Sequence, residues 1–568
     1  MPPGNTQFGL IPIDWESEPV PNLGQYDSYE EARANFEWEI PDTFNIATDV
    51  VTRHAEKRGR VALFQRIEDE GERTYTFWQL ERESNRLANA LEARGIGQGD
   101  RIAIVGARSD RVMLAHLAAW KLGAVSVPLS TLYGADALEF RLDDCDASAV
   151  FVDRGLSETL SDALESIDTV ECVVEMGGTT SQFDEVEAIG FEELDDAPSF
   201  EAVETAADDP ALILYTSGTT GRPKGVVQEH QSLLGWLPSF QMCFELPWHD
   251  SDPLLYATPD LAWIGGINLV LGSWHYGFPA FRYDSRSRFD PETVFENIDR
   301  YGPTRAVLVP GMLKPMSKLD ASQYDLDSLQ VVMSGSEPVS EQLYEYVTET
   351  LGANLNEMYG QTEAMHLVTS CSQWVDADPG SLGYPAPGHD VRVIDEDGTE
   401  CDPGETGIIG LRGPDPAMLL ELWNDDEATQ RKFVADDEWM NTDDLGYYDE
   451  DGQLWFKSRA DDLIITNGYR VGPAEVEDSI RELEQVREVG IIGVEDENRG
   501  EIIKAFIEPA EGATPDEQLK EQVRSHVKNN LAKYEYPREI AFIDHVPTTV
   551  TGKIQRSKLE EREREGAA

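Results

Sequence analysis

The sequence has few cysteines and no long apolar run. Its five cysteines are scattered along the chain without a CxxC pair, so it shows neither a disulfide framework nor a cysteine-based metal site. No stretch approaches the roughly 18–20 consecutive apolar residues that a membrane helix needs. The N-terminal residues also lack the basic and apolar regions of a secretory signal. We therefore predict a soluble, cytoplasmic protein that does not insert into membranes.

Positive charge is also scarce. The chain has 13 lysines and 33 arginines against 108 acidic residues, which gives a formal net charge of −62. Self-repulsion on this scale destabilises a compact state at low salt, whereas 1 M salt screens charges beyond about 3 Å. The acidic residues are spread along the whole chain, which is typical of a salt-adapted, halophilic protein. Nucleic acid is not expected as a partner, because phosphate binding needs a basic surface.

A chain of 568 residues is too long for one hydrophobic core. From residue 74 onward, helical and strand-like patterns alternate, which predicts an α/β fold with mostly parallel sheets flanked by helices. The expected helices are 80–94 and 112–122, and the expected strands are 101–105, 124–128, 149–152, 211–215, 306–309 and 329–333.

The pattern changes twice further along the chain. Short strands at 391–394 and 407–412, separated by turn signals, predict a small β subdomain. A fresh block of helix, two strands, helix and strand then follows, at 473–483, 488–494, 502–508, 516–531 and 539–543. The sequence thus predicts a large domain over residues 1–460 and a small α+β domain over residues 461–568, with a frayed acidic end at 560–565.

A glycine- and hydroxyl-rich loop follows the expected strand 211–215. Backbone N–H groups and hydroxyls in such a loop can surround phosphate oxygens, and Lys224 supplies a point charge. The order Gly-x4-Gly-Lys-Ser/Thr of a Walker loop is absent. Taken alone, the string also fits a flexible surface turn. The residues that would contact phosphate are Thr216, Ser217, Gly218, Thr219 and Thr220.

A second polar segment, residues 356–364, reads Asn-Glu-Met-Tyr-Gly-Gln-Thr-Glu-Ala. Glu363 is a hard carboxylate that suits Mg²⁺, and Thr362 can donate a hydrogen bond to a phosphate. The ring of Tyr359 can lie against a purine. Taken alone, this segment also fits a core tyrosine followed by an exposed polar loop.

Three more segments are weaker by themselves. The glycine turn at 334–338, Ser-Gly-Ser-Glu-Pro, also fits an ordinary turn between a strand and a helix. Residues 439–475 contain several acidic turns, and the carboxylate of Asp444 can accept from both hydroxyls of a ribose. Lys553 lies on a glycine-bearing loop near the end of the chain, where most lysines are solvated surface charges.

In their order and spacing, these five segments resemble the adenylate-forming superfamily of acyl-CoA synthetases, luciferases and peptide-synthetase adenylation domains. Residues 215–226 match its phosphate loop almost residue for residue, and Tyr-Gly-Gln-Thr-Glu at 359–363 matches a second motif. Thr-Gly-Lys-Ile-x-Arg at 551–556 matches the segment of its mobile adenylation lysine. The resemblance covers roughly residues 45–560, and it implies a mobile C-terminal domain.

The resemblance also implies roles for individual residues. Lys553 would be the mobile catalytic lysine, and Asp461 the hinge between the two domains. The catalytic residues would be Lys553, Thr362, Glu363 and Lys224, with Glu363 holding Mg²⁺. Besides the phosphate loop, the cofactor-binding residues would be Gly335, Ser336, Glu337 and Pro338 beside adenine, Tyr359, Gln361, Asp444 on the ribose, Arg459, and Gly468 and Arg470 near coenzyme A.

The chain departs from the family pattern at three points. Ala364 and Met365 follow Glu363 where the family often has Thr-Gly, and Ser458 stands where Gly is usual before the arginine. The usual Thr-Gly-Asp is here Thr-Asp-Asp, which makes Asp443 an extra acid. Given the composition, we interpret Asp443 as salt adaptation.

The implied chemistry needs no side-chain nucleophile. A carboxylate attacks the α-phosphorus of ATP and expels pyrophosphate, and a thiol then attacks the acyl-adenylate. Because the first two partners are anionic, Lys553, Lys224 and Mg²⁺ would neutralise the charge in the transition state. We therefore expect ATP, Mg²⁺ and coenzyme A as cofactors, a small carboxylic acid as substrate, and an AMP-forming acyl-CoA synthetase as the enzyme class.

The acid is predicted from the residues that would line its pocket. In acetate-specific relatives a tryptophan closes the acid pocket at the residue before Gln-Thr-Glu. This chain has Gly360 there, which we expect to make the pocket deeper. Trp263 resembles an apolar pocket wall, with a plain core tryptophan as the alternative. Residues 44–50 look like those of medium-chain and aryl acyl-CoA synthetases. A short- to medium-chain fatty acid is therefore favoured, with benzoate-like acids next, and acetate or propionate as a further alternative.

Other functions are compatible with parts of this pattern. An adenylating enzyme could load a carrier protein instead of coenzyme A, although no carrier domain follows Lys553. A non-catalytic nucleotide binder would be expected to lack Lys553, Glu363 or Asp444, and all three are present. A general NTPase would release phosphate and no AMP. A homo-oligomer is compatible with the sequence.

Overall fold

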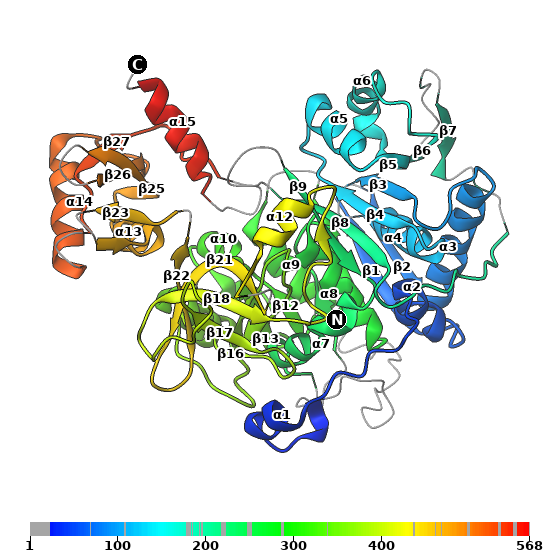
Figure 1. The fold of residues 1–568 in the computed structure, drawn as a ribbon, viewed down its shortest axis with the longest axis horizontal. Coiled ribbons are helices and arrows are strands. Elements are labelled where there is room, and N and C mark those ends of the chain that lie inside the picture. The colour runs from blue at the N-terminus through cyan, green and yellow to red at the C-terminus, as the bar shows by residue number, and fades with distance from the viewer. Residues whose placement is uncertain are drawn as a thin grey trace.

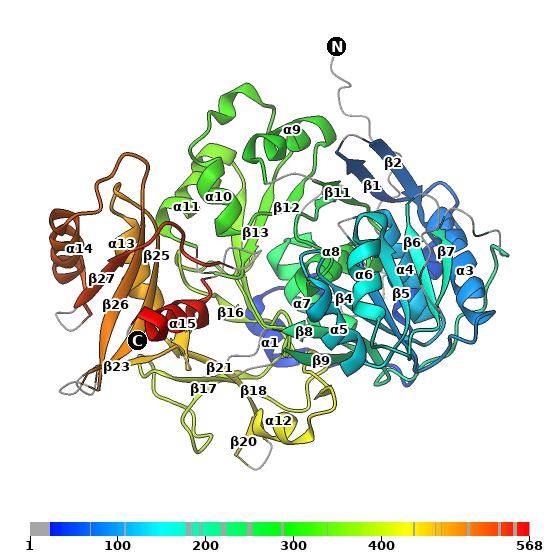
Figure 2. The same cartoon turned by 90° about the horizontal axis from the view of Figure 1, so that it is seen from above.

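A computed structural model gives the fold of the protein. It describes residues 23–566 apart from 69, 107–108, 178–182, 184–185, 192–193, 195–196, 217–222, 247–252, 286–288, 338, 436–437, 461, 467–468, 497–499, 532–534 and 549–553. Two large mixed sheets flanked by helices form the bulk of the molecule, and a smaller C-terminal unit lies at one side (Figures 1 and 2).

The first large sheet carries Thr216, the first of the predicted phosphate contacts. In the described part of the chain its strand order is β19-β9-β8-β4-β3-β5-β6-β7, and β4, β8, β3, β5, β6 and β7 are joined by parallel pairs. Strand β9 turns back antiparallel to β8. The bounds are β3 Arg101–Val105, β4 Val125–Leu129, β5 Ala147–Asp153, β6 Cys172–Met176, β7 Glu187–Gly190, β8 Pro210–Thr216, β9 Lys224–Glu229 and β19 Glu421–Leu422.

The second large sheet carries the start of the glycine turn at 334–338 and the start of the segment 356–364, called the Tyr359 segment below. Its described strand order is β16-β15-β14-β13-β12-β10-β11-β1-β2, with parallel pairs in the middle and antiparallel pairs at both edges. The bounds are β1 Val61–Ile67, β2 Gly71–Thr76, β10 Leu255–Tyr256, β11 Ala280–Asp284, β12 Arg305–Val307, β13 Val331–Gly335, β14 Asn354–Tyr359, β15 Val368–Thr369 and β16 Tyr384–Pro385.

An antiparallel sheet and a mixed sheet complete the molecule. The β subdomain has the order β17-β18-β21-β20 with β22 paired to β21, and the C-terminal unit has β24-β23-β26-β25 with β27 paired to β26. The bounds are β17 Val391–Ile394, β18 Gly407–Arg412, β20 Phe433–Val434, β21 Trp439–Tyr448, β22 Leu454–Arg459, β23 Ile464–Thr466, β24 Tyr469–Val471, β25 Val486–Asp496, β26 Gly500–Pro509 and β27 Glu539–Phe542.

Helices cover the faces of these sheets. A capping box between Thr76 and Gln79 starts α3, and Asp290 with Pro291 starts α9, which ends at the left-handed Gly302. The α-helices are α1 Tyr29–Asn35, α2 Ile46–Val50, α3 Phe77–Glu92, α4 Asp110–Lys121, α5 Ala135–Asp144, α6 Ser157–Leu164, α7 Ser232–Cys243, α8 Ile264–His275, α9 Pro291–Tyr301, α10 Pro310–Met316, α11 Glu341–Glu345, α12 Asp426–Arg431, α13 Pro473–Arg481, α14 Glu517–Asn530 and α15 Arg556–Gly566.

The predicted α/β fold with mostly parallel sheets, a β subdomain and a C-terminal α+β unit is confirmed. Expected elements coincide with observed ones within a few residues, as for α13 and β17. One expectation is wrong. The acidic end at 560–565 lies within helix α15, and Leu559 near its start is fully buried against the C-terminal unit. No helix among the described residues has the length and apolar character needed to cross a membrane.

Candidate active site

The candidate ribose carboxylate lies beside the Tyr359 segment. Tyr359 ends β14, and its hydroxyl donates to Oδ2 of Asp444 on β21 at 2.7 Å. The side-chain amide of Gln361 donates to the same oxygen at 3.2 Å and to the carbonyl of Thr442 at 2.8 Å. Both Tyr359 and Asp444 are buried. Two segments far apart in the sequence thus form one hydrogen-bonded cluster.

Arg459 faces this cluster from the next strand. It is paired with Asp444 in the register of β21 and β22, and its guanidinium lies 3.6 Å from Oδ1 of Asp444. The arrangement presents a buried carboxylate flanked by a cation, a phenol and an amide. A carboxylate held in this way suits the two hydroxyls of a ribose.

The candidate Mg²⁺ ligand is anchored through its main chain. The N–H of Leu419 donates to the carbonyl of Glu363, and Gln228 on β9 donates to the carbonyl of Thr362, both at 2.7 Å. The Glu363 side chain is 17% exposed. Among the described residues no group of three or more His, Cys, Asp or Glu could hold a metal. A lone carboxylate nevertheless fits Mg²⁺, which commonly takes one or two carboxylates together with substrate phosphates and water.

Antiparallel strands flank the glycine- and hydroxyl-rich loop. Thr216 at the end of β8 is paired in register with Lys224 at the start of β9. The predicted phosphate contacts Ser217, Gly218, Thr219 and Thr220 lie outside the described residues. Gln228, four residues after Lys224, connects β9 to Thr362, so the first two motifs meet at the site.

The glycine turn follows β13 as predicted. A β-carbon on Gly335 would lie 2.7 Å from the carbonyl of Met358, and Ser336 has a φ of +75°. The buried carboxylate of Glu357 accepts from the N–H of Val339 at 3.0 Å and so holds the far end of the turn. Burial raises the pKa of Glu357 to about 8. Pro338 lies outside the described residues.

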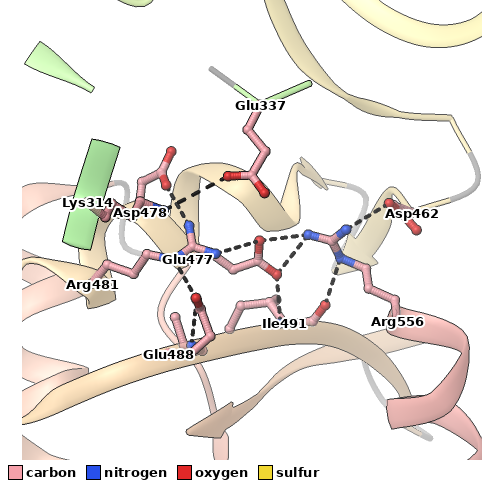
Figure 3. Close-up of polar contacts among 10 residues, drawn as sticks. Lys314, Glu337, Asp462, Glu477, Asp478, Arg481, Glu488, Ile491 and Arg556 are labelled. Carbon is pink, nitrogen blue, oxygen red and sulfur yellow. Dashed lines mark hydrogen bonds and ion pairs between the residues drawn. The ribbon is translucent and has the colours of Figure 1, made fainter. Parts of the chain in front are cut away.

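Glu337 lies between the large domain and the C-terminal unit. Its carboxylate is 3.9 Å from the ammonium of Lys314 on α10, and burial raises its pKa while Lys314 and Arg481 of α13 lower it. Figure 3 shows Glu337 beside the charged cluster of α13. The turn that is predicted to border adenine therefore also faces the C-terminal unit.

A second charged cluster organises the end of the chain. Arg556 donates twice to Glu477 at 2.7 Å, and also to Asp462 at 3.0 Å and to the carbonyl of Ile491 at 3.2 Å (Figure 3). Lys553, the predicted hinge Asp461 and Gly468 lie outside the described residues. The main chain of Arg470 is part of β24.

Both residues of the predicted acid pocket are described. Trp263 is only partly buried where it precedes α8, and its role as a pocket wall stays a prediction. A β-carbon on Gly360, however, would lie 2.3 Å from the backbone nitrogen of His366. The space directly beside Gly360 is therefore filled by the main chain. The absence of a tryptophan at this position does not by itself make the pocket deeper.

Comparison with known proteins agrees with this geometry. The sequence pattern of the AMP-binding enzyme family matches residues 51–420, and that of the AMP-binding enzyme C-terminal domain matches residues 475–553. The chain belongs to the AMP-binding enzyme family. It is an AMP-forming ligase of the acyl-CoA synthetase kind.

Individual relatives of this AMP-binding enzyme span nearly its whole length. The acetyl-coenzyme A synthetase of Bacillus subtilis is 32% identical, with 94% of each chain covered. The mitochondrial acyl-coenzyme A synthetase ACSM3 of Mus musculus is 30% identical, with 95% of this chain and 94% of the relative covered. The crystal structure of the anthranilate CoA ligase AuaEII in complex with anthranoyl-AMP superposes with a TM-score of 0.81 at 28% identity, covering 93% of this chain and 99% of that one.

Three residues of this AMP-binding enzyme's site were not predicted from the sequence. Gln228 and Glu357 are buried polar residues that hold the motif segments, and Lys432 lies beside Glu363. Glu357 is part of the segment 356–364, but its position in a strand gave no reason to single it out. Gln228 and Lys432 belong to no motif, and only the packing of distant strands brings them to the site.

Proposed function

We propose that this protein is an ATP-dependent acid–CoA ligase that forms an acyl-adenylate and then an acyl-CoA thioester. The observation that carries the proposal is the buried cluster of Tyr359, Gln361 and Asp444 beside Arg459. This cluster suits the ribose of a nucleotide. The likeness to a CoA ligase in complex with anthranoyl-AMP supports an acyl-adenylate as the intermediate.

In the first step, a carboxylate oxygen of the acid bonds to the α-phosphorus of ATP, and the bond to the pyrophosphate oxygen breaks. The chain would supply Lys224 and Lys553 as cations beside the phosphates. Asp444 would hold the ribose, and the turn at 335–338 would border the adenine. Mg²⁺, when bound at Glu363, would neutralise phosphate charge in the transition state.

In the second step, the sulfur of coenzyme A bonds to the acyl carbon, and AMP leaves with the electron pair of the broken acyl–phosphate bond. We propose that residues 461–568 act as a mobile domain with its hinge at Asp461. Lys553 would face the site in the first step, and the Gly468–Arg470 loop would face coenzyme A in the second. The packing of α13 beside β22 and Glu337 places the C-terminal unit next to the candidate site.

The acid that we propose is a short- to medium-chain fatty acid. Met365 and His366, at the end of the segment 359–366, contact neutral side chains. The amide of Asn268 on α8 contacts the sulfur of Met365 at 3.1 Å, and the ring of Trp236 lies 5.4 Å from that of His366. Burial lowers the pKa of His366 to about 3, so this ring is neutral at pH 7. Such a wall suits an apolar tail better than a second carboxylate.

Two alternatives for the acid follow from particular observations. The rings of Trp236 and the partly buried Trp263 suit an aromatic acid, and the anthranilate CoA ligase is a structural relative. The main chain that fills the space beside Gly360 suits a smaller acid such as acetate or propionate, and an acetyl-coenzyme A synthetase is a sequence relative.

The proposal is tested by measuring AMP formation. The purified protein is incubated in molar KCl with ATP, Mg²⁺, coenzyme A and single acids from acetate to dodecanoate, and with benzoate. We expect AMP to form only with an acid present, with the highest rate at medium chain length. AMP formation that peaks with acetate or benzoate would support the ligase activity but identify a different preferred acid.

Omitting coenzyme A separates the two steps. The acid should then still cause one equivalent of pyrophosphate to be released per site, without turnover. Turnover with a carrier protein but not with coenzyme A would show that a carrier protein is the acyl acceptor. Phosphate release without AMP in a folded protein would contradict the proposal.

A further inference from the structure

Asp443 has a backbone conformation that side chains rarely adopt. Its φ is +59°, although it lies within strand β21 and carries a β-carbon. Left-handed backbone is costly for residues other than glycine, and aspartate is among the few that tolerate it. The AMP-binding pattern that the sequence resembles has glycine at this position. Salt adaptation alone would place an extra acid at a less strained position.

The main chain and the side chain of Asp443 are both held. Its N–H donates to the side chain of Asn441 at 2.7 Å, and its carbonyl accepts from the N–H of Ala460 at 2.8 Å. Its carboxylate oxygen Oδ2 accepts from the ammonium of Lys432 at 2.7 Å. The strained backbone therefore directs this carboxylate toward one particular lysine.

Lys432 connects Asp443 to the candidate Mg²⁺ ligand. Its ammonium nitrogen lies 3.7 Å from Oε1 of Glu363, and its side chain is only 14% exposed. Lys432 follows helix α12, whereas Glu363 belongs to the Tyr359 segment. One ammonium group thus bridges a carboxylate of the β subdomain and a carboxylate of the proposed catalytic motif.

We propose that Lys432 competes with the divalent cation for Glu363, and that Asp443 holds the ammonium when the metal displaces it. This inference rests on the proposed function of the same site. Lys432 lies within ion-pair distance of Glu363, at 3.7 Å, and donates a closer hydrogen bond to Asp443, at 2.7 Å. When the metal–nucleotide complex enters, two cations beside one carboxylate repel each other. The carboxylate of Asp443 then keeps Lys432 nearby without leaving it unpaired.

The geometry gives two variants with opposite effects. Lys432→Met removes the competing charge and keeps the length of the side chain, so less Mg²⁺ should be needed. Asp443→Asn keeps a residue type that tolerates left-handed backbone but removes the second partner of Lys432. Lys432 then pairs with Glu363 alone, so more Mg²⁺ should be needed.

The test measures Mg²⁺ binding without catalysis. The full chain is saturated with α,β-methylene-ATP, which cannot transfer its adenylyl group to an acid, and Mg²⁺ is titrated while heat of binding and thermal unfolding are recorded. For partly screened pairs of this kind we expect the half-saturating Mg²⁺ concentration to fall about three- to tenfold in Lys432→Met, and to rise about threefold in Asp443→Asn. Arg431→Met is the control, because its partner Glu427 is 83% exposed and belongs to α12.

The double variant separates competition from a general change of charge. If Asp443 acts through Lys432, adding Asp443→Asn to Lys432→Met should not change the Mg²⁺ requirement further. An additive rise in the double variant would overturn the proposal, as would an unchanged requirement in Lys432→Met or an equal shift in Arg431→Met. If Lys432→Met does not fold, the rise expected in Asp443→Asn decides.

The Mg²⁺ titration and the AMP assay can fail separately. A protein that forms no AMP with any acid, yet shows these shifts, would refute the ligase and keep the competition at Glu363. Normal AMP formation with no shift in any variant would support the ligase and refute the competition at Glu363. Binding of the analogue without any effect of Mg²⁺ on the wild-type protein would also overturn the inference.

Discussion

The hydroxyl of Tyr359 donates to Asp444 at 2.7 Å, although 85 residues separate the two in the sequence. Tyr359 ends strand β14 of a mixed sheet, and Asp444 lies on β21 of the β subdomain. Their contact joins the two parts of the candidate nucleotide site. It also explains why a buried carboxylate at this point can keep a fixed orientation before a ligand arrives.

Tyr359→Phe tests this contact. Removing the hydroxyl takes a hydrogen bond of 2.7 Å from Oδ2 of Asp444, and the longer bond from Gln361, at 3.2 Å, stays. We expect the KM for ATP to rise about five- to tenfold, with a smaller change in kcat, because a buried hydrogen bond to a charged group is lost. Tyr448→Phe, on the strand of Asp444, is the matched control, since the Tyr448 hydroxyl donates to the carbonyl of Val391 at 3.0 Å. A similar rise in both variants would contradict a specific role.

Asp444→Asn tests the proposed grip on the ribose. The wild-type protein should discriminate against 2′-deoxy-ATP, because a carboxylate accepts from both ribose hydroxyls. In the variant we expect kcat/KM for ATP to fall about a hundredfold, and the preference for ATP over 2′-deoxy-ATP to shrink about tenfold. The measurement is initial rates with both nucleotides. A loss of rate with unchanged discrimination would assign Asp444 to the structure of the site alone.

Lys553→Ala tests the proposed division between the two steps. Lys553 is expected to act only while the α-phosphorus is attacked. The variant should therefore lose acid-dependent pyrophosphate release, and should still convert supplied acyl-adenylate and coenzyme A to the thioester. Arg564→Ala, at an exposed pair with Glu560 in α15, serves as the control. Equal loss in both half-reactions would contradict the idea.

Arg556→Ala tests the charged cluster that anchors the end of the chain. Glu477 is 4% exposed and accepts two hydrogen bonds from Arg556. Removing the guanidinium leaves a buried carboxylate without its main partner, which should destabilise the C-terminal unit by about 3 kcal/mol. Thermal unfolding and hydrogen exchange in α13 would show this. Arg556→Lys, which cannot form the paired contact, should recover only part of the loss.

Glu357 gives a dependence of stability on pH. Its pKa is raised from 4.5 to about 8 in the folded protein, so the folded state binds the proton more tightly than the unfolded state. The stabilisation is complete below about pH 4.5 and is lost as the pH rises toward 8. Glu357→Gln removes this contribution. Denaturant unfolding at pH 5 and pH 8 should therefore show a smaller loss of stability in the variant, by about 3 kcal/mol. Parallel losses would contradict the raised pKa.

The motif segments carry most of what could be predicted from the sequence. Alternating helical and strand patterns predicted the parallel sheets, because buried strands such as β3 are short runs of apolar residues. The segments at 215–226 and 356–364 were predicted to share one site. The hydrogen bond from Gln228 to Thr362 brings the two together. The end of the chain was predicted incorrectly, because the acidic run gave no sign that Leu559 packs against the C-terminal unit.

The pocket for the acid was the least predictable part. A glycine in a sequence shows which side chain is missing, but not what takes its place. Beside Gly360 the space is taken by the main chain of His366, which has a φ of +54°. Such a backbone reversal depends on how segment 359–366 packs against neighbouring helices, and no local pattern encodes it.

The sequence alone determined the order of the elements, the motif residues and their chemistry, because strand patterns, glycine loops and charged groups are local properties. Tertiary structure decided which of these groups meet. It brought Tyr359 to Asp444, Gln228 to Thr362 and Lys432 to Glu363, across loops and sheets. It also gave Asp443 a role in one ion pair where composition suggested only an added charge. The physical reason is that hydrogen bonds and ion pairs act over a few ångströms, and only the packed fold sets those distances.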